Sequence, residues 1–171
     1  MVARSLARLG LAALIALSAL AAGARADEVY APLEPLLIDL DGWTAQAPKG
    51  SSMSMDQVKM VNVTRDYAKG DDTIEVTLTS GSQLSSVQLD QDMDMKTDDS
   101  MLKIGAVDGY RVMQTYSKND AHGSIMVRLQ GNATSGALFV FDYHKLQPDE
   151  AMALAKKFDW KALADATAKL Q

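Results

Sequence analysis

The strongest constraint on the fold is a pair of alternating segments that flank a short turn. Apolar and polar residues alternate on both sides of the turn: Val61, Val63 and Tyr67 do so within residues 58–68, and Ile74, Val76 and Leu78 within residues 73–79. A period of two is typical of a strand with one buried and one wet face. Residues 69–72 (KGDD) between the segments have the composition of a tight turn. The sequence therefore predicts an antiparallel β-hairpin.

The same pattern predicts more strands in the second half of the chain. They cover residues 103–107, 110–116, 123–130 and 137–143, separated by turns at Asp108-Gly109, 118–120 and Gly131-Asn132. Residues 137–143 (ALFVFDY) are apolar at nearly every position, which indicates a central strand covered on both sides. Before the hairpin we expect a short strand over 36–40, a turn at Asp41-Gly42 and a return over 43–47, then a flexible polar stretch over 50–57.

Helices are expected in two parts of the chain, between the strands and at the C-terminus. Residues 81–100 fit a helix or a long excursion over one sheet face, because their five aspartates are poor strand formers. Pro148 suits a first helical position, and Asp159 can cap a second helix. The predicted fold class is α+β, a twisted antiparallel sheet flanked by helices.

Residues 1–26 have the three parts of a secretory signal peptide. Two early arginines precede an apolar run, and Ala24-Arg25-Ala26 provides the small residues that a signal peptidase requires. We expect cleavage after Ala26, a periplasmic location, and one domain over residues 27–171. An uncleaved anchor is the alternative, but the run is short and rich in alanine. No later stretch is long enough to predict a membrane span.

The charge and the cysteine content exclude several function classes. Cleavage would remove three arginines and no acid, leaving 14 basic against 22 acidic residues, a net charge of −8. Such a domain does not present the clustered cations that nucleic acid or anionic lipid requires. The chain contains no cysteine, which excludes disulfides, thiolate ligands, cysteine nucleophiles and the lipidated cysteine of a lipoprotein.

The methionines suggest one candidate metal site. Met53 and Met55 form one M-x-M pair, and Met93 and Met95 form another, both in polar segments. Thioether sulfur is a soft ligand that selects Cu(I), so copper carriage through these four residues is one hypothesis. The alternative is that the methionines fill irregular gaps between a helix and the sheet.

Other motifs are incomplete. Asp90, Asp92 and Asp94 have the spacing that opens a calcium loop, but Met95 stands at the glycine position of that loop. The S-x-x-K match at residues 100–103 has no partner motif, and we reject it as a nucleophile site. His122 and His144 allow a small hydrolase only formally, because no G-x-S-x-G turn is present.

The order of the elements resembles a known fold group. Gly42-Trp43, residues 48–50, RDYAKGDDTIEVTL at 65–78 and VDGYRVMQTY at 107–116 precede a third hairpin and a final helix. This order is similar to that of the Mog1/PsbP-like group, including its small exported bacterial members. The resemblance implies an α-β-α sandwich and a largely non-enzymatic, accessory or partner-binding role. No metal-associated position of the photosynthetic members carries over.

The resulting expectation is a non-enzymatic periplasmic accessory or binding protein without a cofactor, the copper carrier being the alternative. Its partner would be another envelope protein or a small ligand, and its oligomeric state stays open. We expect the contact surface to combine residues 50–60 with 83–101, because polar loops that carry methionines suit adaptable recognition.

Overall fold

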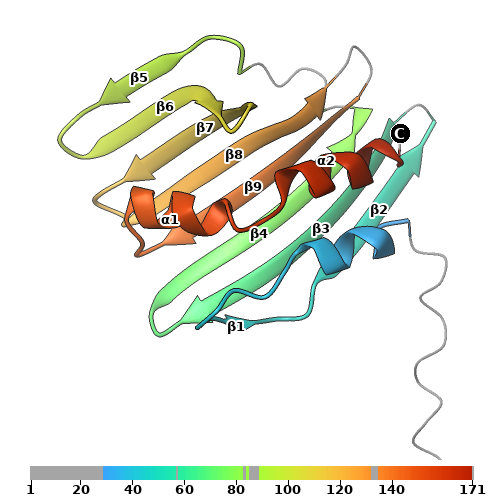
Figure 1. The fold of residues 1–171 in the computed structure, drawn as a ribbon, viewed down its shortest axis with the longest axis horizontal. Helices are drawn as coiled ribbons and strands as arrows, with labels where there is room; N and C mark the ends of the chain where they lie inside the picture. Colours follow the sequence, from blue (N-terminus) through green and yellow to red (C-terminus); the bar gives the residue numbers. More distant parts are fainter. Residues whose placement is uncertain (1–28, 57, 83, 85–88, 132–134, 171) are drawn as a thin grey trace, which may run out of the picture.

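The computed structural model of the chain describes residues 29–56, 58–82, 84, 89–131 and 135–170, so the expected leader lies outside the described residues. Within them the chain forms a nine-stranded sheet and three short helices (Figure 1). The helices are η1 (Ala31–Leu36, a 3-10 helix), α1 (Pro148–Ala155) and α2 (Trp160–Ala168). The strands are β1 (Thr44–Ala45), β2 (Lys49–Met55), β3 (Val58–Lys69), β4 (Asp72–Gly81), β5 (Met93–Lys96), β6 (Ser100–Val107), β7 (Tyr110–Ser117), β8 (His122–Gly131) and β9 (Gly136–His144).

Every strand pairing in the sheet is antiparallel. The strand order is β1-β3-β4-β9-β8-β7-β6-β5, and β2 also pairs with β3. Strands β5 to β9 are consecutive neighbours, whereas β9 also pairs with β4 and so joins this meander to the β3–β4 hairpin. The sheet-dominated α+β class predicted from the alternation is therefore confirmed.

The predicted hairpins form where the turn residues allow them. The β3–β4 hairpin closes at Gly70, and the β6–β7 hairpin closes at Asp108 and Gly109, which have φ values of 50° and 86°. Two consecutive positive φ angles are what the two-residue turn between twisted antiparallel strands requires. Aspartate and glycine tolerate that conformation better than most residues, so a short sequence signal fixes the turn.

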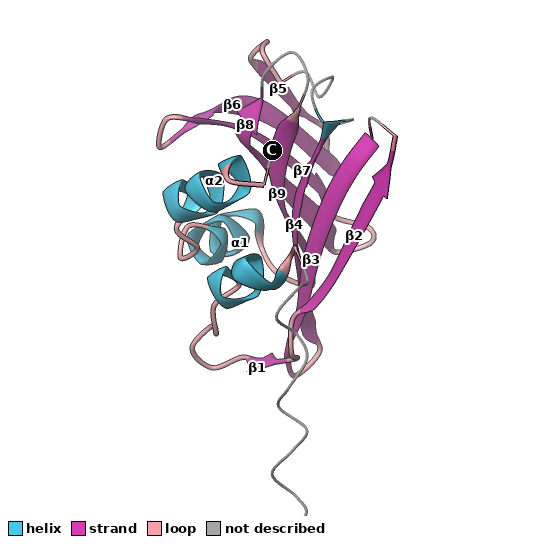
Figure 2. Ribbon diagram, turned by 90° about the vertical axis from the view of Figure 1, so that its right-hand side faces the viewer, coloured by secondary structure: helices cyan, strands magenta, loops and turns pink. Residues whose placement is uncertain are grey.

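Within the described residues, all three helices lie on one side of the sheet (Figure 2). We call this side the helix face and the opposite side the outer face. The core between helices and sheet is aromatic: the ring of Phe139 on β9 lies 5.2 Å from Phe158, which joins α1 to α2, and 6.4 Å from Trp160. Aromatic side chains bury more apolar surface than other residues, so this cluster dominates the packing energy.

Gly123 leaves room for one of these aromatic contacts. It lies between Tyr116 and Tyr143 on the helix face, and those two rings stack with centroids 6.3 Å apart. A Cβ atom at position 123 would lie 2.3 Å from the Tyr143 ring. Only glycine therefore fits at this position.

The C-terminal helices agree with the sequence prediction. Pro148 begins α1, and the Asp159 carboxylate accepts a hydrogen bond from the Ala162 amide at 2.9 Å, as an N-cap residue does. The stripe Ala151, Ala155 and Leu163 is buried against the sheet. None of the helices in the described part of the chain has the length and apolarity needed to cross a bilayer.

The prediction for residues 36–40 was wrong. The segment 31–36 forms a 3-10 helix with Pro32 in its first turn, and no strand follows it before β1. Leu33, Leu37 and Leu40 are buried at spacings of four and three residues, so the buried positions do not alternate as those of a strand do. The predicted return strand over 43–47 shrinks to the two residues of β1, which pair with β3.

Two polar segments that were expected to be irregular form edge strands. Residues 49–55 form β2 alongside β3, and residues 93–96 form β5 alongside β6, while residues 83 and 85–88 of the expected excursion lie outside the described residues. All four residues of β5 are exposed. Because an edge strand keeps polar and charged side chains in water, aspartates are tolerated there.

The prediction that the strand over residues 137–143 is covered on both faces is confirmed only in part. On the helix face of β9, Phe139 and Phe141 are fully buried, but on its outer face Val140 is half exposed. Leu138 is buried on that outer face and is not part of the main core. In the described residues, no α-helix covers the outer face (Figure 2).

Candidate functional site

The outer face is organised in rows, because antiparallel register places cross-strand partners side by side. Five partners in succession across β5, β6, β7, β8 and β9 are apolar: Met93, Ile104, Met113, Met126 and Val140. We call these residues the apolar row. Side chains at directly opposed positions are within contact distance, so the row is a continuous strip across five strands.

The apolar row is accessible in the described structure. Met93 is 39% exposed, and the other four members are half-buried. Its neighbour Met95, opposite Leu102, is 56% exposed. Exposed apolar side chains that gather on one face, unlike scattered ones, indicate a surface that another molecule covers.

A second row on the outer face carries negative charge. Asp66, Glu75 and Asp142 are successive partners across β3, β4 and β9. Like charges at directly opposed positions are destabilising. The structure offsets this repulsion with a pair between Lys49 and Asp66 at 3.9 Å, whose side chains are 78% and 46% exposed. Such an exposed pair contributes little, so the acidic row can still gain from an approaching cation.

Residues 89–92 are fixed across the other end of the outer face. Arg111 and Arg128 are cross-strand partners there. Arg111 donates to the Leu89 carbonyl at 2.6 Å and to Asp92 at 2.7 Å, and Arg128 donates to Asp90 at 2.5 Å. Leu89 is buried. This part of the excursion therefore lies over one sheet face, as the sequence predicted.

The same contacts explain why the aspartates of residues 90–94 do not form a calcium site. The carboxylates of Asp90 and Asp92 pair with different arginines. Asp94 is the cross-strand partner of Lys103 and faces the opposite side of the sheet from Met93. In the described residues, no three histidine or acidic side chains are placed to hold a metal ion.

The four methionines of the copper hypothesis do not come together. Met53 and Met55 lie on β2, and Met93 and Met95 lie on β5, at opposite edges of the sheet. Seven strand spacings of about 4.8 Å separate these edges. One ion therefore cannot bind all four sulfur atoms of one chain, and the proposed four-methionine site is not formed.

The structure instead forms a smaller methionine cluster. Met53 is the cross-strand partner of Met60, and Met55 lies two residues farther along the same face of β2. Met53 and Met55 are 46% and 63% exposed. Together with Met93 and Met95, they make up four of the exposed large hydrophobic side chains, and all four lie on the outer face.

The histidines lie together, which the sequence analysis missed. His122 and His144 are cross-strand partners at the ends of β8 and β9, next to Asp142. Neither imidazole hydrogen-bonds a serine or carboxylate within the described residues, although Ser117 donates to Asp120 nearby at 2.7 Å. The arrangement therefore lacks the serine–histidine contact that nucleophilic catalysis requires.

The rejected S-x-x-K match is also explained by the register. Ser100 opposes Ser117, and Lys103 opposes Gln114. An offset of three positions puts Ser100 and Lys103 on opposite faces of the strand, so the amine cannot activate the hydroxyl.

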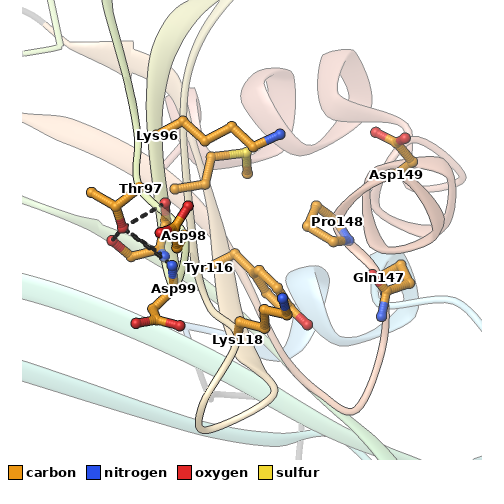
Figure 3. Close-up of a pocket in the computed structure, with 11 residues that line it drawn as sticks. Lys96, Thr97, Asp98, Asp99, Tyr116, Lys118, Gln147, Pro148 and Asp149 are labelled. Atoms are coloured by element: carbon orange, nitrogen blue, oxygen red, sulfur yellow. Dashed lines mark hydrogen bonds between the residues drawn. The ribbon is translucent and has the colours of Figure 1, made fainter.

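A pocket of about 380 Å³ lies between the β5–β6 turn and the start of α1 (Figure 3). Its turn side is held by Thr97, whose hydroxyl oxygen accepts the Ser100 amide at 3.0 Å and pairs with the Ser100 hydroxyl at 2.8 Å. Asp149 and Lys96 lie on opposite sides of it (Figure 3). The hydroxyls of the turn bind each other and do not converge on a ligand, which a small-molecule site would need.

Comparison of the chain with protein-family models, curated proteins and solved structures finds no match.

Proposed function

We propose that this chain is an exported, non-catalytic binding protein whose outer face docks an apolar, positively charged segment of another protein. The single observation that carries the proposal is the apolar row. Its sulfur-containing and aliphatic side chains lie half exposed across five strands, with no α-helix of the described residues over them. Methionine suits such a surface because its flexible side chain adapts to different partners.

Charge determines what kind of segment fits. The acidic row begins at Asp142, two residues along β9 from Val140, where the apolar row ends. The arginines at the other side of the row already pair with Asp90 and Asp92. A docked segment therefore meets apolar side chains with the carboxylates of Asp142 and Glu75 beyond one end of the row, which favours a partner with apolar residues beside lysine or arginine.

The same charge disfavours self-association through this face. Two copies that met outer face to outer face would bring acidic rows together, and the mature chain would carry a net charge of −8. Juxtaposed like charges oppose association. The proposed occupant is therefore a segment of a different protein.

The wider context of the proposal comes from the sequence. The leader pattern of residues 1–26 supports export to the periplasm, and the order of hairpins and C-terminal helices supports kinship with the Mog1/PsbP-like group. The outer face is where this chain departs from the two helical layers that the group implies, within the described residues.

A second candidate function is binding of Cu(I), now at Met53, Met55 and Met60 alone. The observation that favours it is that these three thioethers share one face of the β2–β3 pair. Anaerobic Cu(I) titration tests it. Micromolar or tighter binding that is lost in Met60→Leu supports the site, whereas unchanged binding in that variant contradicts it.

Methyl NMR with two synthetic peptides tests the docking proposal. One peptide is an amphipathic helix of leucine and lysine, and the other has glutamate in place of lysine. We expect the basic peptide to shift the methyl signals of Met113 and Met126. The Met152 methyl on α1, on the other side of the sheet, should stay unchanged. Equal binding of the acidic peptide, or shifts centred on Met152, would contradict the proposal.

Charged variants supply the matched control. Met126→Lys and Met93→Lys place a cation in the apolar row and should weaken binding of the basic peptide at least tenfold. Ala153→Lys adds the same charge at an exposed position of α1 and should leave binding unchanged. Met93 is exposed, so its variant keeps the test valid if Met126→Lys does not fold.

A further inference from the structure

The two histidines of the chain form a defined pair at the edge of the outer face. His122 and His144 are the only histidines in the sequence, and they are directly opposed on β8 and β9. The Lys145 amide donates to the Ala121 carbonyl at 2.6 Å, just outside the pair. Hydrogen-bonded and non-hydrogen-bonded pairs alternate along an antiparallel ladder, so the bond between residues 121 and 145 makes His122 and His144 a non-hydrogen-bonded pair. In such a pair the opposed Cα atoms lie about 4.5 Å apart and the side chains are closest.

The backbone fixes this pair on both sides. Ala121 and Lys145, which follow the histidines outward, both have positive φ values, 47° and 65°. Both strands therefore end immediately beyond the imidazoles. Lys145 also pairs with Asp71 at 3.2 Å, which ties this end of β9 to the turn between β3 and β4.

Acidic side chains line the same hollow. A pocket of about 350 Å³ is lined by both histidines together with Asp142, Glu75 and Thr73. Asp142 lies two residues before His144 on the same strand face, and Glu75 is the cross-strand partner of Asp142. In the described residues neither imidazole has a hydrogen-bond partner, and His122 is exposed. The Nδ1 and Nε2 atoms of both imidazoles are therefore free to bind a ligand.

We propose that His122 and His144 bind one divalent transition-metal ion, with Asp142 as the third ligand. Imidazole nitrogen and carboxylate oxygen suit Zn(II) and Cu(II), and Cu(II) binds a given nitrogen–oxygen site more tightly. No three such side chains already stand in ligating positions in the described residues. The strand pairing opposes His122 and His144, and binding requires side-chain rotations that bring both imidazoles and the Asp142 carboxylate onto one ion.

This site goes beyond the docking function and does not depend on it. It uses nitrogen and oxygen ligands from β8 and β9, shares only Asp142 with the acidic row, and uses neither the apolar row nor any methionine. Its failure would leave the peptide-binding proposal standing, and failure of peptide binding would leave the metal site standing.

NMR of the imidazoles with added Zn(II) tests the proposal directly. The protein is prepared without a polyhistidine tag, so the two imidazole signals report this pair alone. We expect both signals to shift together and to saturate at one equivalent of Zn(II), with a micromolar or lower Kd by calorimetry. A shift of one signal only, or of neither, would overturn the proposal.

Substitutions identify the ligands. His122→Gln and His144→Gln should each weaken Zn(II) binding at least tenfold, and Asp142→Asn should weaken it less. The matched control is Asp94→Asn, which removes a carboxylate from the distant edge strand β5 and should change nothing. Circular dichroism verifies that each variant is folded. Binding that survives both glutamine variants, or that falls equally in Asp94→Asn, would contradict the assignment.

Discussion

At the level of single residues, two buried tyrosines on the helix face differ in the surroundings of their hydroxyls. Tyr67 donates to the Ile38 carbonyl at 2.8 Å. The Tyr143 hydroxyl is buried and has no hydrogen-bond partner among the described residues. An unpaired buried hydroxyl costs free energy, whereas a paired one contributes about 1 kcal/mol.

This contrast predicts opposite effects of the same substitution. Tyr67→Phe should lower the free energy of unfolding by about 1 kcal/mol, because it leaves the Ile38 carbonyl unpaired. Tyr143→Phe should leave the free energy of unfolding unchanged or raise it by up to about 1 kcal/mol. Urea unfolding of both variants measures the difference. A larger loss of stability in Tyr143→Phe than in Tyr67→Phe would contradict the structure.

The same two residues predict how stability depends on pH in alkaline solution. Burial raises the pKa of Tyr67 to about 12 and that of Tyr143 to about 12, above the usual value of 10.0. Between these values the unfolded chain releases protons that the folded chain retains, so the stability falls as pH rises. We expect the urea midpoint to fall between pH 10 and 12, and to fall less in Tyr143→Phe. If the urea midpoint of Tyr143→Phe falls with pH as steeply as that of the unsubstituted protein, groups other than Tyr143 cause the loss of stability.

At the level of elements, helix α2 depends on its N-cap. Asp159 accepts the Ala162 amide at 2.9 Å, and the helix that it begins carries Trp160 and Leu163 into the core. Asp159→Ala should cost about 1 kcal/mol of stability, and Asp159→Asn should cost less, because asparagine also caps helices. Thermal unfolding measures both. Equal losses in the two variants would show that the cap does not act through this hydrogen bond.

Elements with a local signal could be predicted from the sequence. The hairpins closed by Gly70 and by Asp108-Gly109 combine alternation with turn residues, and both were predicted. The edge strands β2 and β5 were missed because edge strands need no buried face, so their polar residues show no alternation. The 3-10 helix over Ala31–Leu36 was missed because so short a segment cannot separate helical from strand spacing.

The histidine pair could have been found from the sequence. His122 directly precedes one predicted strand and His144 directly follows the next. In an antiparallel hairpin the start of the first strand meets the end of the second, so the two flanking residues must oppose each other. By contrast, the apolar row combines residues from five strands, and only the full strand order shows that they are neighbours.

At the level of the whole molecule, the predicted signal peptide can be tested by following the fate of residues 1–26. If residues 1–26 are a signal peptide, expression in a bacterial host should yield a mature chain that begins at Asp27. Intact-mass spectrometry of the periplasmic fraction measures this. A chain that retains residues 1–26 and stays in the membrane fraction would favour the uncleaved anchor.

The distribution of surfaces over the molecule supports binding through one side. The helix face is filled by the aromatic core and three helices, whereas the outer face carries the apolar row, the acidic row, the exposed methionines and the histidine pair. Both segments in which the sequence predicted a contact surface contribute to the outer face, through β2 and β5. They lie at its opposite edges, so the contact surface that we propose between them consists of residues that were not predicted.

Photo-crosslinking in intact cells tests the central claim most directly. A photoreactive amino acid replaces Met126 in the apolar row or, as the control, the exposed Ala153 on α1. The account predicts that position 126, and not position 153, crosslinks to another protein, through a peptide that carries apolar residues beside lysine or arginine. Equal crosslinking from position 153, or products from position 126 that contain a second copy of the chain or an acidic peptide, would contradict it.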